Sequence, residues 1–106
     1  MSDSLTAVVH TYLEYLRVER QLSAHTLSNY QRHLQAMMEW LQEKQIRDWR
    51  ELNNPLVRQW AHTLRKHKET SPRTISTKMS ALRSFADWLV IRGILAANPA
   101  RGVALP

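Results

Sequence analysis

Apolar side chains recur at helical spacing, every three or four residues, in four segments of this chain. The segments cover residues 4–20, a stretch of about 20 residues after Ser23, residues 55–66 and residues 72–93. Their apolar positions are, in order, Leu5, Val9, Tyr12, Leu13 and Leu16; Leu27, Tyr30, Leu34, Met37, Met38 and Leu41; Leu56, Trp60, Ala61 and Leu64; and Ile75, Met79, Leu82, Phe85, Ala86 and Leu89. With two glycines and no alternating β-branched run, the pattern predicts an all-α bundle of four to five helices.

Polar residues at the edges of these segments predict where the helices begin and end. Ser23 is a suitable N-cap, and Asn54-Pro55 supply a cap and a first helical residue for the segment that runs to residue 66. Pro72 begins the last helix and Gly93 ends it. The last three predicted helices therefore each have a start signal, and the fourth also has a stop signal.

The chain of 106 residues is long enough for one compact core. We expect a single helical domain over residues 1–93, in which residues 44–53 form one or two helical turns that pack on the core. Residues 94–106 hold turn residues without a helical period, which predicts the start of an interdomain linker.

Two of the predicted helices carry a polar face opposite the apolar one. On helix 72–93 this face lies within about 60°, at roughly 100° per residue, and consists of Arg73, Thr77, Ser80 and Ser84. On the helix that follows Ser23 it consists of His25, Ser28, Asn29 and Arg32. Short side chains with an arginine among them let a helix approach a phosphate backbone and the base edges beside it.

The net charge of +6 is confined to one part of the chain. Residues 55–83 hold seven basic residues against Glu69 alone, whereas the remainder holds eight basic and eight acidic residues. Such segregation predicts a polyanionic partner, and duplex DNA fits the polar helix faces. The plainer alternative is a solvated basic surface that only keeps the protein soluble.

The candidate DNA contacts follow from the two polar helix faces and from the segregated positive charge. On helix 72–93 they are Arg73, Thr74, Thr77, Lys78 and Arg83, and Arg83 has the alternative of an ion pair with Asp87 four residues on. On the earlier helix they are His25, Ser28, Asn29 and Arg32. Possible further phosphate contacts are Arg65, Lys66 and Lys68.

Several function classes are disfavoured. No cysteine is present, so disulfides, thiolate zinc sites and thiol nucleophiles are excluded, which suits a reducing cytoplasm. The N-terminal residues lack the pattern of a signal peptide, and no apolar run approaches the length of a membrane span. The five histidines lack metal-ligand spacing, and Tyr12 and Tyr30 lie on apolar stripes. We expect no cofactor, no metal and no membrane partner.

Several short motifs occur in a characteristic order along the chain: Tyr12-Leu13, Val18-Glu19-Arg20, Leu22-Ser23 with Thr26 and Tyr30, Leu82-Arg83-Ser84-Phe85, Asp87-Trp88-Leu89, Asn98-Pro99-Ala100 and Gly102-Val103. Together they resemble the N-terminal core-binding domain of tyrosine recombinases, most closely the bacterial Xer branch. The resemblance implies an all-helical, SAM-like bundle that forms half of a clamp around DNA, with its second and fourth helices facing the duplex.

The resemblance also implies what lies outside this chain. In the family a C-terminal domain carries the tyrosine nucleophile with two arginines, a lysine and histidines, and no position here matches that motif. We therefore expect the chain itself to be no enzyme. Its parent protein is expected to resolve chromosome dimers in the bacterial cytoplasm, together with a second recombinase of the same branch in a heterotetramer.

Two alternatives remain open at this stage. A stand-alone helix-turn-helix regulator predicts a turn of three or four residues before its recognition helix, and the loop of about five residues before Pro72 fits this poorly. A helical protein–protein module predicts an exposed apolar groove and no salt-dependent DNA affinity.

Overall fold

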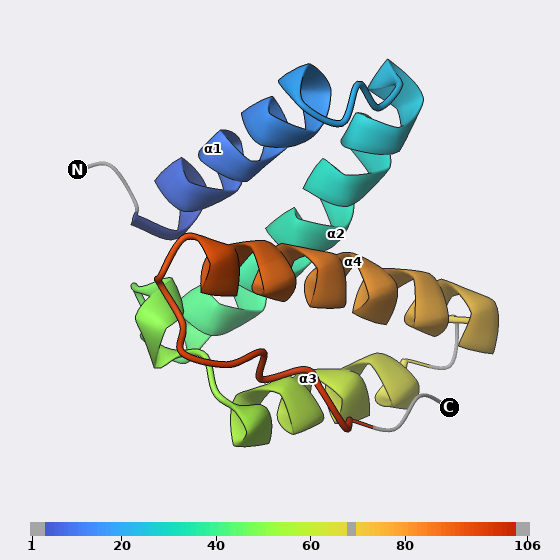
Figure 1. Ribbon diagram of the computed structural model, residues 1–106. Helices are drawn as coiled ribbons and strands as arrows, with labels where there is room; N and C mark the ends of the chain where they lie inside the picture. The colour runs from blue at the N-terminus through green and yellow to red at the C-terminus, as the bar shows by residue number, and fades with distance from the viewer. Residues whose placement is uncertain (1–3, 68–69, 104–106) are drawn as a thin grey trace. The chain divides into compact units, whose positions relative to one another are not determined.

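The computed structural model describes residues 4–67 and 70–103. Within these ranges the chain forms four α-helices, a short 3₁₀ turn and no strand, which confirms the all-α prediction (Figure 1). The elements are α1 (Ser4–Val18), α2 (Ala24–Glu43), η1 (Trp49–Glu51), α3 (Asn54–Lys66) and α4 (Pro72–Ile91). The chain divides into two compact units, residues 1–51 and 52–106.

The first unit is built on the apolar faces of α1 and α2, which run beside each other (Figure 1). Its most buried side chains are Leu5, Val9, Tyr12, Leu16, Leu34, Met37, Met38, Leu41 and Trp49. Tyr12 stacks on Tyr15 and Tyr30, with ring centroids 6.4 and 6.5 Å away. The indole Nε1 of Trp49 donates to the carbonyl oxygen of Leu5 at 3.0 Å, so the predicted turn near residue 49 is tied to the start of α1.

Helix α3, in the second unit, begins one residue earlier than the sequence predicts. Asn53, not Asn54, is the N-cap of α3, because its Oδ1 accepts from the amide of Leu56 at 3.0 Å. Asn54 is then helical, and its Nδ2 donates to Pro99 O at 3.1 Å. The buried face also differs by one position, since Val57 is fully buried while Leu56 is half-buried.

Helix α4 contributes the largest apolar face of the second unit. The buried side chains of α4 are Ile75, Met79, Ala81, Leu82, Phe85, Ala86, Trp88 and Leu89. The rings of Phe85 and Trp88 lie 6.1 Å apart. This face contains every position of the predicted apolar stripe, and Ala81 and Trp88 widen it.

Residues 94–103 fold back on α3 and α4 (Figure 1). Asn98 Nδ2 donates to Arg83 O at 3.2 Å and to Asp87 Oδ1 at 2.8 Å. Arg83 Nη2 donates to Val103 O at 3.0 Å, and Ala100 is fully buried. We call these hydrogen bonds the C-terminal clasp. That a linker starts at residue 94 stays a prediction.

Helices α2 and α4 end in the same hydrogen-bond pattern with different residues. After α2, the amides of Gln45 and Ile46 donate to Gln42 O and Leu41 O, and Gln45 has a φ of 64°. After α4, the amides of Gly93 and Ile94 donate to Val90 O and Leu89 O, and Gly93 has a φ of 76°. Both are Schellman motifs, in which glycine is the preferred left-handed residue.

We expect Gly93→Ala to lower the free energy of unfolding by about 1–2 kcal/mol, the cost of a left-handed non-glycine residue. An added Cβ would meet no atom within 4 Å, so backbone strain rather than a clash sets this cost. The matched variant Gln45→Gly should raise stability by up to about 1 kcal/mol. Urea unfolding followed by circular dichroism measures both. A Gly93→Ala variant as stable as the wild type would contradict the assignment.

Candidate nucleic-acid interface

Helices α2 and α4 begin with the same local arrangement. Ser23 Oγ accepts from the Thr26 amide at 3.2 Å, and the two hydroxyl oxygens are 3.0 Å apart. In α4 the corresponding distances from Ser71 to Thr74 are 3.1 and 2.9 Å. A serine cap that satisfies an otherwise unpaired amide stabilises the first helical turn. Each cap is followed two residues later by a predicted contact residue, His25 in α2 and Arg73 in α4.

Three of the predicted contacts on α2 form one connected row. Arg32 Nη2 donates to Asn29 Oδ1, and Asn29 Nδ2 lies 3.4 Å from His25 Nε2. His25 and Arg32 are exposed, and Asn29 is half-buried. The row therefore presents an arginine, an amide and an imidazole along one side of the helix, all able to bond to phosphate oxygens or base edges.

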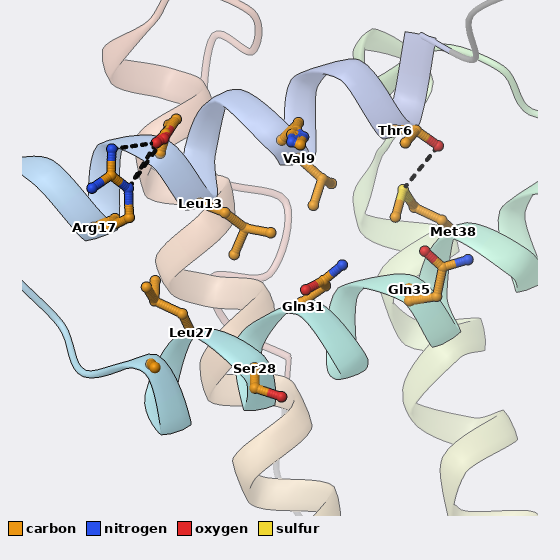
Figure 2. Close-up of a pocket in the computed structure, with 12 residues that line it drawn as sticks. Thr6, Val9, Leu13, Arg17, Leu27, Ser28, Gln31, Gln35 and Met38 are labelled. Carbon is orange, nitrogen blue, oxygen red and sulfur yellow. Dashed lines mark hydrogen bonds and ion pairs between the residues drawn. The ribbon is translucent and has the colours of Figure 1, made fainter.

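Ser28, predicted as part of the same face, lines a different surface. A groove of about 380 Å³ runs between α1 and α2, and Ser28 belongs to its α2 wall with Gln31 and Gln35 (Figure 2). Figure 2 shows both glutamines on the side of α2 that faces α1. The apolar lining comes from Val9, Leu13, Ala24, Leu27 and Met38.

The α1 side of the groove carries an ion pair and a sulfur contact. Arg17 Nη2 lies 2.7 Å from Glu14 Oε1, and this hydrogen-bonded pairing lowers the pKa of the Glu14 carboxyl below its ordinary value. Thr6 Oγ1 lies 4.0 Å from the sulfur of Met38 (Figure 2). Arg17 and Glu14 neutralise each other, so this pair adds no net charge to the groove.

The polar face of α4 is present as predicted. Its members Arg73, Thr77, Ser80 and Ser84 are all exposed. Thr77 Oγ1 donates to Arg73 O at 3.0 Å, which fixes the hydroxyl rotamer one turn into the helix. Two other predicted contacts on α4, Thr74 and Lys78, have side chains that are less available to a ligand. The Thr74 hydroxyl is within hydrogen-bonding distance of the cap Ser71, and Lys78 is half-buried.

Arg83 belongs to the C-terminal clasp. Its guanidinium donates to Val103 O, while Asp87 accepts from Asn98. The predicted alternative partners, Arg83 and Asp87, are therefore each engaged by the C-terminal segment. The periodicity of α4 could not show this, because the partners lie 11 to 20 residues further along the chain.

The basic residues of α3 form a separate set. Arg65 and Lys66 are exposed in its last turn, and Lys68 lies outside the described residues. Arg58, which was not among the predicted contacts, lines one cavity with Arg65. The sequence did hold a signal for this pairing: Arg58 and Arg65 are seven residues apart, and positions seven apart lie on nearly the same side of a helix.

The boundary between the two units also divides the charge. Residues 1–51 hold six basic and seven acidic residues, a formal charge of −1. Residues 52–106 hold nine basic and two acidic residues, a formal charge of +7. The second unit therefore carries the excess positive charge, the kind of surface that attracts polyanions in general.

Two further findings concern the described part of the chain. Its histidines and carboxylates do not gather in groups of three that could hold a metal ion. No helix in that part is both long enough and apolar enough to cross a bilayer.

Comparison with known proteins places this arrangement in a family. Residues 9–93 match the model of the phage integrase N-terminal SAM-like domain. The chain is 46% identical to tyrosine recombinase XerC of Shigella flexneri serotype 5b over 98 residues, 92% of this chain and 33% of that protein. It is 45% identical to tyrosine recombinase XerC of Salmonella typhi over 103 residues, 97% of this chain and 34% of that protein.

A solved structure has the same fold. The crystal structure of the N-terminal domain of a phage integrase/site-specific recombinase from Haloarcula marismortui superposes with a TM-score of 0.85 at 21% identity, covering 100% of this chain and 99% of that one. The present chain spans about a third of the length of its XerC relatives. The predicted SAM-like, all-α fold is confirmed, and the chain belongs to the phage integrase N-terminal SAM-like family as a tyrosine recombinase core-binding domain.

Proposed function

We propose that this domain binds duplex DNA through the outer polar faces of α2 and α4, as one half of a clamp. The observation that carries the proposal is the pair of serine-capped helices, each with an arginine on an exposed polar face. Family membership and the charge of +7 on the second unit support it. Arg32 and Arg73 supply phosphate or guanine contacts, and His25, Asn29 and Thr77 supply hydrogen bonds to the backbone or base edges.

The parent protein is proposed to be a XerC-like recombinase. In that role the catalytic residues lie in a further domain, and strand exchange with a XerD-like partner resolves chromosome dimers in the bacterial cytoplasm. The contribution of this domain is to hold and position the recombination site. Thr74, Lys78 and Arg83 act at the margin of the α4 face, since capping, partial burial and the C-terminal clasp already engage them.

We expect this domain to bind a Xer-type recombination site of about 30 base pairs with an affinity that falls steeply with salt. Each neutralised phosphate contributes about −0.9 to the slope of log K against log salt, so a slope of several units is expected. Fluorescence anisotropy on the site and on a scrambled duplex measures both the slope and the sequence preference. Absence of binding even at low salt would reject the proposal in favour of a protein–protein module.

The two arginines test the assignment of the faces. Arg32→Ala and Arg73→Ala are each expected to weaken DNA binding by about 1–3 kcal/mol, because each removes a charge-assisted contact. Stability should change by less than about 0.5 kcal/mol, since both side chains are exposed. The matched control is Arg50→Ala, an exposed arginine of η1 that lies on neither face. If all three variants bind alike, the faces are wrongly assigned.

A further inference from the structure

The segment 94–103 has no helical period, yet it is anchored to the second unit at several points. Hydrogen bonds tie Asn98, Pro99 and Val103 to α3 and α4. Ala100 is fully buried, and Val103 is only 6% exposed. A connection that served only to span a distance would need neither buried side chains nor partners on two helices. The docking of this segment therefore calls for a role of its own.

Asn98 is the centre of the C-terminal clasp, because its whole amide group is engaged. Its Nδ2 donates to Arg83 O at 3.2 Å and to Asp87 Oδ1 at 2.8 Å. Its Oδ1 accepts from the Ala100 amide at 2.9 Å. Both amide protons and the carbonyl oxygen thus have partners, two of them one turn apart on α4. This one side chain sets the register between the segment and α4.

Further hydrogen bonds fix the backbone on both sides of Ala100. Asn54 Nδ2, in the first turn of α3, donates to Pro99 O at 3.1 Å. Arg83 Nη2 donates to Val103 O at 3.0 Å. The Val103 amide donates to Ala100 O at 3.3 Å, which closes a tight turn before the segment ends. The place of residue 103 is therefore fixed with respect to α4.

We propose that Asn98 is a positioning residue, which through the C-terminal clasp fixes the point beside α4 from which the chain leads into the further domain of the parent protein. The inference rests on the proposed function, since it assigns the clasp to the connection between the two halves of a DNA clamp. The region matched by this chain makes up 33% and 34% of two XerC relatives, so most of such a protein depends on this connection.

The physical effect of the clasp is to remove freedom from the connection. Ten residues without contacts would behave as a flexible chain with a root-mean-square end-to-end distance of about 17 Å. When one half of the clamp is on the duplex, binding of the other half is an intramolecular step, whose effective concentration depends on the length and stiffness of the connection. Docking of residues 94–103 shortens the free part and directs the second half toward the duplex held by α4.

The first test measures the clasp in this domain by ¹⁵N relaxation. The amides of Ala100, Arg101 and Val103 are expected to have order parameters near about 0.85 in the wild type, and below about 0.6 in Asn98→Ala. The matched control Asn53→Ala also removes an asparagine side-chain hydrogen bond from the second unit, at the cap of α3, and should leave these values unchanged. Rigid amides in Asn98→Ala would overturn the role of Asn98.

The second test compares DNA binding by the isolated domain and by the full-length parent protein. Asn98→Ala is expected to weaken binding of the full-length protein to a Xer-type site by about tenfold, since the effective concentration of its second half falls. The isolated domain with the same substitution should bind within about twofold of its wild type, because Asn98 lies outside the polar face of α4.

Variants of Asp87 separate positioning from a general loss of stability. Asp87→Asn keeps an oxygen that can accept from Asn98, so both the order parameters and the full-length affinity should stay close to the wild-type values. Asp87→Ala removes one of the three bonds and should give a smaller loss than Asn98→Ala. Circular dichroism checks that each variant keeps its helices.

The outcomes distinguish the inference from the proposed function. Wild-type affinity of full-length Asn98→Ala, with mobile amides at 100–103 in the domain, would overturn the positioning role. Equal losses in the domain and the full-length protein would overturn it too, because the substitution would then act on the DNA-binding face itself. If the wild-type domain binds no duplex at any salt concentration, the proposed function fails, whatever the order parameters show.

Discussion

The capping hydrogen bonds of Ser23 and Ser71 are the interactions on which the proposed interface depends. Each serine oxygen accepts an amide proton of the first turn, so α2 and α4 are ordered from their first residues. His25 and Arg73 stand in these first turns, where a frayed helix would leave their side chains without a fixed direction. The uncompensated amides and the helix dipole at the same ends also favour a nearby phosphate.

The two units differ in the chemistry that they offer to the proposed DNA interface. The second unit carries nearly all the excess positive charge, so it supplies long-range attraction that is screened by salt. The first unit is close to neutral, and its row of His25, Asn29 and Arg32 offers directional hydrogen bonds instead. In this account charge brings the duplex to the domain, while short polar side chains on two helices determine how it is held.

Much of this fold could be predicted from local sequence, because apolar spacing and turn residues act over a few positions. The four helices and the exposed face of Arg73 and Thr77 follow from such signals. What local patterns could not supply are contacts between distant residues. The hydrogen bond from Arg83 to Val103 and the cavity bordered by α3 and Gly102 both depend on residues 94–103, a segment without helical period. The cap of α3 was misplaced by one residue because Asn53 and Asn54 are chemically equivalent.

The most direct measurement of the central claim is a ¹H–¹⁵N NMR titration of the ¹⁵N-labelled domain with duplex DNA at low salt. The account predicts that the amides which shift most lie in the first three turns of α2 and of α4, on the outer faces that carry Arg32 and Arg73. Shifts confined to the α1–α2 groove around Leu13 and Gln31, with the face of α4 unaffected, would contradict it.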